Sequence, residues 1–85
     1  MEAYIRREYP EQASRIIKVV DCESSFNTLA EGDNSRSFGL VQIHLPAHPT
    51  VSKAQATDPK FALDFIIKEW RAGHESMWTC TRLTK

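Results

Sequence analysis

The feature that most constrains the fold is an apolar stripe of helical spacing that runs directly into a carboxylic acid. Apolar side chains recur there at intervals of three and four residues, at Ala13, Ile16, Ile17 and Val20. This spacing is typical of the side that an amphipathic helix buries. Continued by three residues beyond Val20, the stripe reaches Glu23. The sequence therefore predicts a helix from Pro10 to Cys22 or Glu23, with Glu23 facing the interior or the wall of a cleft.

This position disfavours the ionised form of Glu23. Burial raises the pKa of a carboxyl group, and the negative end of the helix dipole acts in the same direction. A carboxylic acid that stays protonated near neutral pH can donate a proton to a leaving group, as glycoside cleavage requires. The alternative for Glu23 alone is a solvated acid that caps the helix or forms a surface ion pair.

Length and charge restrict the classes of protein to consider. The chain has 85 residues, which predicts one domain spanning residues 1–85 with a single modest core. Its formal net charge is zero and it has no run of Lys or Arg, which argues against nucleic acid as a partner. Lys18 interrupts the apolar run Ile16–Val20, so we expect no membrane span. No leader of the secretory type follows Met1, so we expect either a domain cut from a longer protein or export by another route.

The two cysteines, Cys22 and Cys80, allow two interpretations. They are either reduced thiols of a cytosolic protein or one disulfide that joins the central helix to the C-terminal segment. We favour the disulfide, because a domain this small benefits from a cross-link and Cys22 directly precedes Glu23. In the chain-entropy model a bridge enclosing nearly the whole domain stabilises it by about 4 kcal/mol, less any strain.

The histidines do not suggest a metal centre. His44 and His48 are four residues apart, but Pro46 lies between them and disfavours the helix that would align them. His74 is distant from both along the chain. We expect surface or loop histidines, no metal and no cofactor.

The remaining elements are less strongly patterned. Residues 2–8 predict a short helix, residues 24–37 an irregular stretch with room for a short strand or hairpin, and residues 52–56 a turn or two of helix. Asp58 and Pro59 are typical of a helix start, and Gly73 of its end. The tail, residues 74–85, carries Met77, Trp78 and Cys80 and is expected to pack over the core. The predicted fold class is mainly α, with at most a minimal β element.

Two short motifs resemble a known family. The segment Glu23–Asn27 reads Glu-Ser-Ser-Phe-Asn, and Gly39–Ile43 reads Gly-Leu-Val-Gln-Ile. In this order and at this spacing they resemble the paired signature of the lytic transglycosylase SLT domain, in the lysozyme-like superfamily that includes the goose-type lysozymes. The resemblance covers roughly residues 12–72. The Cys-Glu-Ser opening and the Trp-x-Cys ending are similar to its short phage- and secretion-associated branch. It implies a small lysozyme-like domain.

The resemblance also implies roles for individual residues. Glu23 would protonate the glycosidic oxygen and afterwards act as a base. The implied substrate-binding residues are Gln42, which would line the cleft, Ser37, which would bond the Glu23 carboxyl, Ser24, which would hold the backbone as the helix ends, and Ile43. Asp33 and Glu31 are the candidates for a second carboxylate. The alternative for both, which we favour, is a solvated loop charge.

The substrate implied is the glycan strand of peptidoglycan, cut between N-acetylmuramic acid and N-acetylglucosamine. Such a family uses one carboxylate, with the N-acetyl group of the substrate assisting. Attack by the 6-hydroxyl of the sugar gives a 1,6-anhydro product, and attack by water gives the product of a lysozyme. We accordingly expect a monomeric extracytoplasmic enzyme, secreted, periplasmic or delivered to the wall by a phage.

The alternative function is a non-catalytic module that binds peptidoglycan or a partner protein. The family's late segment, which contributes a tyrosine to the cleft, has no counterpart here, and His74–Cys80 stands in its place. Trp78 and Tyr4 are candidates to replace that aromatic side chain. In a small protein such residues are more often part of the core.

Overall fold

The computed structural model describes residues 1–74, 78 and 80 of the chain. Its helices are α1 (Glu2–Glu8), α2 (Ala13–Ser24), the 3-10 turn η1 (Leu45–Ala47), α3 (Lys53–Ala56) and α4 (Pro59–Arg71). Its strands are β1 (Glu31–Gly32), β2 (Ser37–Phe38) and β3 (Ile43–His44). The described part of the chain is therefore mainly α with a small β element, as the sequence predicted.

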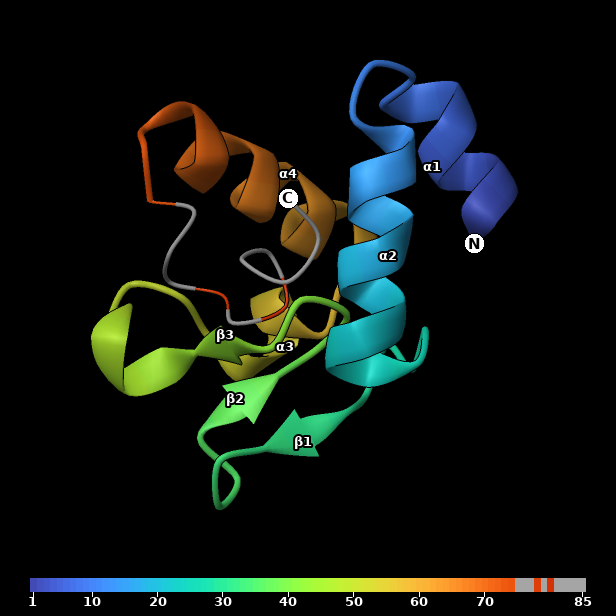
Figure 1. Ribbon diagram of the computed structural model, residues 1–85. Coiled ribbons are helices and arrows are strands. Elements are labelled where there is room, and N and C mark those ends of the chain that lie inside the picture. The colour runs from blue at the N-terminus through green and yellow to red at the C-terminus, as the bar shows by residue number, and fades with distance from the viewer. Residues whose placement is uncertain (75–77, 79, 81–85) are drawn as a thin grey trace.

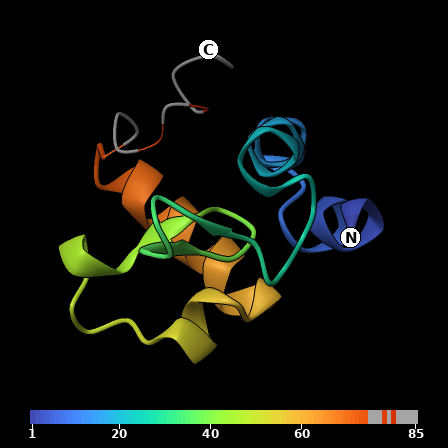
Figure 2. The same cartoon turned by 90° about the horizontal axis from the view of Figure 1, so that it is seen from below.

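The helices form two pairs around the core. Helix α1 packs against α2, and α3 packs against α4. Figure 1 shows α2 between α4 and α1, with the small sheet near the C-terminal end of α2. Viewed from below, α1 and α2 again lie side by side, apart from α4 (Figure 2). None of the helices in the described residues combines the length and apolar character that crossing a bilayer requires.

The three strands form an antiparallel sheet in the order β1-β2-β3. In the register of β2 and β3, Phe38 is opposite Ile43 and Ser37 is opposite His44. Directly opposed residues of an antiparallel pair share a face of the sheet. Phe38 and Ile43 are both buried, so their face contacts the core. Ser37 and His44 therefore share the other face.

The helix α2 differs from the prediction at its start. It begins at Ala13 rather than near Pro10. The backbone N–H of Gln12 donates to Tyr9 O at 3.1 Å, closing a turn, and the N–H of Ile16 donates to Gln12 O at 2.9 Å. The helix can therefore begin only after this turn. Its most buried residues include Val19, which the predicted stripe omitted, whereas Ile17 is only partly buried against the core.

The helix α4 agrees closely with the prediction. Asp58 is its N-cap residue and Pro59 its first residue, although the Asp58 side chain makes no capping bond. The helix ends at Arg71, and Gly73 follows with a left-handed φ of 85°. The apolar face is buried at Ala62, Leu63, Ile66, Ile67 and Trp70. In the tail, Trp78 and Cys80 are buried as expected, while Met77 lies outside the described residues.

Candidate active site

A polar cleft of about 650 Å³ brings together the end of α2, the sheet and the C-terminal segment. The residues that line it are Glu23, Asp33, Asn34, Arg36, Ser37, Gln42, His44, Ala47, His48 and Trp78. Its volume lies within the range of about 300–1,000 Å³ that is usual for ligand sites. Of the residues singled out in the sequence, the structure thus gathers Glu23, Asp33, Ser37 and Gln42 around one cavity.

Glu23 lies in the last turn of α2, half-buried in the cleft wall. Burial raises the pKa of its carboxyl group. The backbone N–H of Cys80 donates a hydrogen bond that opposes this rise, and the negative charge of Asp33 adds to it. The net effect is a pKa above the ordinary value of 4.5. A proton is therefore retained at higher pH than on a solvated glutamate.

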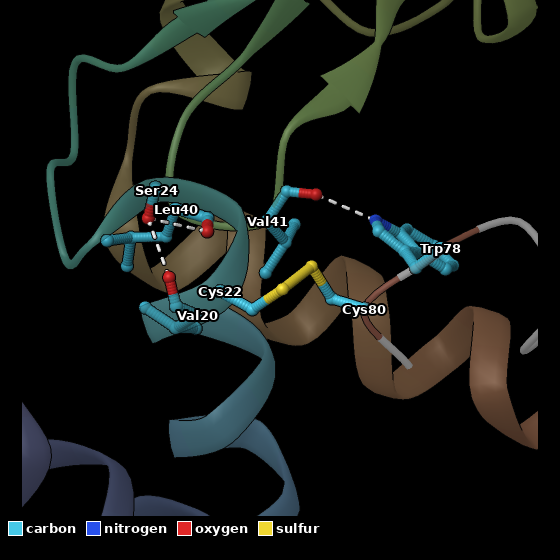
Figure 3. The surroundings of a disulfide bond; sticks show 7 residues. All are labelled: Val20, Cys22, Ser24, Leu40, Val41, Trp78 and Cys80. Atoms are coloured by element: carbon cyan, nitrogen blue, oxygen red, sulfur yellow. Dashed lines mark hydrogen bonds between the residues drawn. A yellow bond between two sulfur atoms is a disulfide. The ribbon is translucent and has the colours of Figure 1, made fainter. Parts of the chain in front are cut away.

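Ser24 joins the end of α2 to the segment Gly39–Ile43. Its hydroxyl lies 2.8 Å from Leu40 O and 3.1 Å from Val20 O, and both contacts are visible in Figure 3. The contact with Leu40 ties the helix to a segment 16 residues further along the chain. Ser24 thus fixes the backbone beside Glu23 but does not line the cleft.

The C-terminal segment is held against the same region by two bonds. Cys22 and Cys80 form a disulfide with an S–S distance of 2.05 Å, which confirms the predicted pair. The indole Nε1 of Trp78 donates to Val41 O at 2.7 Å, and Figure 3 shows both contacts. The bridge thereby brings the N–H of Cys80 to Glu23.

Gln42 lies in the cleft wall with its amide committed to the backbone. Its Nε2 donates to Gly39 O at 2.9 Å and to Ala30 O at 3.2 Å. A Cβ atom on Gly32 would come within 2.4 Å of the Gln42 Oε1 atom. Gln42 therefore braces the turn that leads into β1, in addition to lining the cleft.

Asp33, Ser37 and His44 form a hydrogen-bonded chain on the cleft side of the sheet. Ser37 is 1% exposed, and its Oγ donates to Asp33 Oδ2 at 2.5 Å. The same Oγ lies 3.1 Å from His44 Nδ1. The sequence led us to expect Ser37 to bond Glu23, but its single hydrogen is directed to Asp33.

Besides Ser24, three residues considered for the site lie outside the cleft lining. Ile43 is 1% exposed and lies in the core, because it shares the inner face of the sheet with Phe38, so the structure does not place it among the residues that line the cleft. Glu31 is exposed on β1, 3.8 Å from Lys53 Nζ, which makes it a surface charge. Tyr4 contacts the ring of Tyr9 near the N-terminus. Of the two aromatic candidates, Trp78 is the one that lines the cleft.

The sequence reasoning missed His44 and His48 as cleft residues. Both are partly buried and line the cavity, and His48 contacts the Phe65 ring edge-on at 4.9 Å between centroids. The sequence does carry a signal for His44. Each of the paired segments Ser37-Phe38 and Ile43-His44 has one polar and one apolar residue, and in a hairpin the two polar residues fall on the same face. Within the described residues, no group of three or more His, Cys, Asp or Glu is arranged to hold a metal ion.

Comparison of the chain with protein-family models, with curated proteins and with solved structures finds no significant match.

Proposed function

We propose that this protein is a lytic transglycosylase or muramidase that cleaves the glycan strand of peptidoglycan with Glu23 as its general acid and base. The observation that carries the proposal is the half-buried Glu23 carboxyl with a raised pKa in the wall of a polar cleft. A carboxyl group that keeps its proton to higher pH than an ordinary glutamate is better suited to protonating a leaving glycosidic oxygen. The motif resemblance and the proposed lysozyme-like arrangement agree with this role.

In the proposed reaction the substrate lies across the cleft between Glu23 and the sheet. Glu23 donates its proton to the oxygen that joins N-acetylmuramic acid to N-acetylglucosamine, and that bond breaks. The substrate's own N-acetyl group assists at the anomeric carbon. The Glu23 carboxylate then accepts a proton from the incoming hydroxyl, which belongs either to water or to the sugar's C6 position. Water yields a reducing end, and the sugar hydroxyl yields a 1,6-anhydro end.

Two further features support the proposal. Most of the residues that line the cleft are polar, and their amide, hydroxyl and imidazole groups can form hydrogen bonds with a sugar chain. The disulfide is of the kind found in proteins that work in oxidising compartments, which agrees with action at the cell wall.

The proposal is tested by the clearing of a suspension of purified cell walls. We expect Glu23→Gln to reduce the rate by about 10²–10⁴-fold, the usual contribution of a general acid. Glu31→Gln is the matched control, because it removes a carboxylate on β1 that does not line the cleft. Mass analysis of the released fragments separates anhydro from reducing ends, which differ by one water. If the protein binds walls and clears none, the alternative of a binding module holds.

The rate should also depend on pH with a definite sign. Glu23 must be protonated to act as the acid, so the rate falls as pH rises through its raised pKa. The falling limb should therefore lie above the pH at which an ordinary glutamate ionises. A rate that is constant from mildly acidic to alkaline pH would contradict the assignment of Glu23.

A further inference from the structure

The turn that carries Asp33 has an uncommon backbone. Asp33, Asn34 and Ser35 have φ values of 52°, 58° and 65°, which place three consecutive residues in the left-handed region. L-residues visit this region rarely, although Asp and Asn tolerate it best. Such a turn persists only where surrounding contacts hold it, and strained backbone of this kind often occurs at functional sites.

The contact that holds the turn is directional. A serine hydroxyl carries one hydrogen, and that of Ser37 is donated to Asp33. The bond between His44 Nδ1 and Ser37 Oγ must then be donated by the imidazole N–H. The hydrogen bonds therefore run from His44 to Ser37 to Asp33. Each donor in such a chain polarises the next.

The series of hydrogen bonds ends at Asp33, which lies in the same cleft as the proposed acid, Glu23. Asp33 lines the same cleft as Glu23, and the two carboxyl groups interact electrostatically. Arg36 and His48 also line this cavity, and Lys53 of α3 approaches Glu31 rather than Asp33. His44 Nδ1 lies 3.1 Å from Ser37 Oγ and 3.9 Å from Asp33 Oδ2. The imidazole thus bonds the hydroxyl and lies close to the carboxylate.

We propose that His44 is a positioning residue, which acts through Ser37 to hold the Asp33 carboxylate in the cleft that Glu23 lines. With the imidazole N–H on Ser37 Oγ, the hydroxyl hydrogen has Asp33 as its acceptor. Without it, the hydroxyl rotates and the carboxylate leaves its place. The consequence for catalysis rests on the proposed function, whereas the positioning itself is a property of the resting protein.

The test measures Glu23 in the resting protein and needs no substrate. The Glu23 carboxyl carbon is followed by NMR as a function of pH in protein labelled with ¹³C-glutamate. Asp33→Asn removes a negative charge, so the Glu23 titration should move to lower pH. His44→Ala and Ser37→Ala should move it in the same direction, because Asp33 is no longer held. The ¹⁵N shifts of neutral His44 should report a protonated Nδ1.

The variants of His44 separate positioning from mere packing. Asparagine carries an N–H donor at the place of Nδ1, so His44→Asn should restore the wild-type titration. Glutamine carries its donor one bond further out, so His44→Gln should behave like His44→Ala. His74→Asn is the matched control. His74 is an exposed histidine that bonds Glu69 and does not line the cleft.

Two results would overturn the inference. The first is a Glu23 titration that is the same in His44→Ala as in the wild type. The second is a further shift when His44→Ala is added to Asp33→Asn, because His44 would then act on Glu23 directly. Wall clearing by the same variants is a separate readout. A wild-type protein that shows the expected titrations and clears no wall would refute the proposed function and leave the positioning role of His44 supported.

Discussion

Glu23 occupies a position that opposes its own ionisation. Its carboxyl group is half-buried at the C-terminal end of α2, with Asp33 in the same cleft. Only the N–H of Cys80 acts in the opposite direction among the causes that shift its pKa. A residue whose charged form is disfavoured in the folded state lowers stability wherever that form predominates. The raised pKa that supports the proposed role of Glu23 as an acid therefore reduces the stability of the fold at pH values where the carboxylate predominates.

Glu23→Gln should stabilise the protein in a pH-dependent way. The folded protein holds the Glu23 proton more tightly than the unfolded chain, so the contribution of Glu23 to stability is lost as pH rises from 4.5 through its raised pKa. We expect the melting temperature of the variant to exceed that of the wild type by a few degrees at pH 8, and the two to converge near pH 4. Calorimetry at both pH values checks this. An unchanged difference across the range would show that Glu23 is solvated.

At the scale of elements, the fold depends on a close contact between the Gly39–Ile43 segment and α3. A Cβ atom at Gly39 would lie 1.8 Å from Ala56 O, the carbonyl of the last residue of α3. Gly39 also has a φ of +86°, which favours glycine for a second reason. The same segment receives Ser24 from α2 and Trp78 from the tail, so displacement at Gly39 would reach Glu23.

Gly39 and Gly73 offer a matched pair of substitutions. Their φ values are +86° and +85°, but nothing lies within 4 Å of a Cβ at Gly73. Gly73→Ala should lower the free energy of unfolding by about 1–2 kcal/mol, the cost of a left-handed alanine. Gly39→Ala adds a backbone clash and should cost clearly more or prevent folding. Urea denaturation of both variants compares them, and equal losses would refute the contact with α3.

At the scale of the whole molecule, the disulfide joins the end of α2 to the tail. The two cysteines are separated by 58 residues, so the bridge restricts most of the unfolded chain. Cys80 is buried, whereas Cys22 is exposed. The bridge has two effects: it stabilises the fold as a whole by restricting the unfolded chain, and it holds the backbone N–H of Cys80 at Glu23.

Removal of the disulfide should destabilise the protein strongly. For a loop of this length the chain-entropy model gives a loss of about 4 kcal/mol in the free energy of unfolding. Urea denaturation with and without a phosphine reductant measures it, and the variant Cys22→Ser/Cys80→Ser should match the reduced protein. A midpoint that reductant leaves unchanged would contradict a bridge in solution.

Much of the fold could be read from local pattern. The stripe that ends at Glu23, the Asp58-Pro59 helix start, the Gly73 stop and the cysteine pair are all present in the structure, because each depends on neighbours along the chain or on a single chemical pairing. The start of α2 was wrong by three residues, since the turn closed by Gln12 competes with the helix.

The sequence by itself determined that an acid would end the buried stripe of a helix in a small, mainly α protein, and it favoured a bridge between the two cysteines. Only the tertiary structure decided its surroundings: Asp33 and His44 line the cleft, while Ile43 enters the core. The physical reason is that strands of two residues carry almost no periodic signal. The register of the sheet, which assigns each side chain to one face, is set by contacts between distant segments.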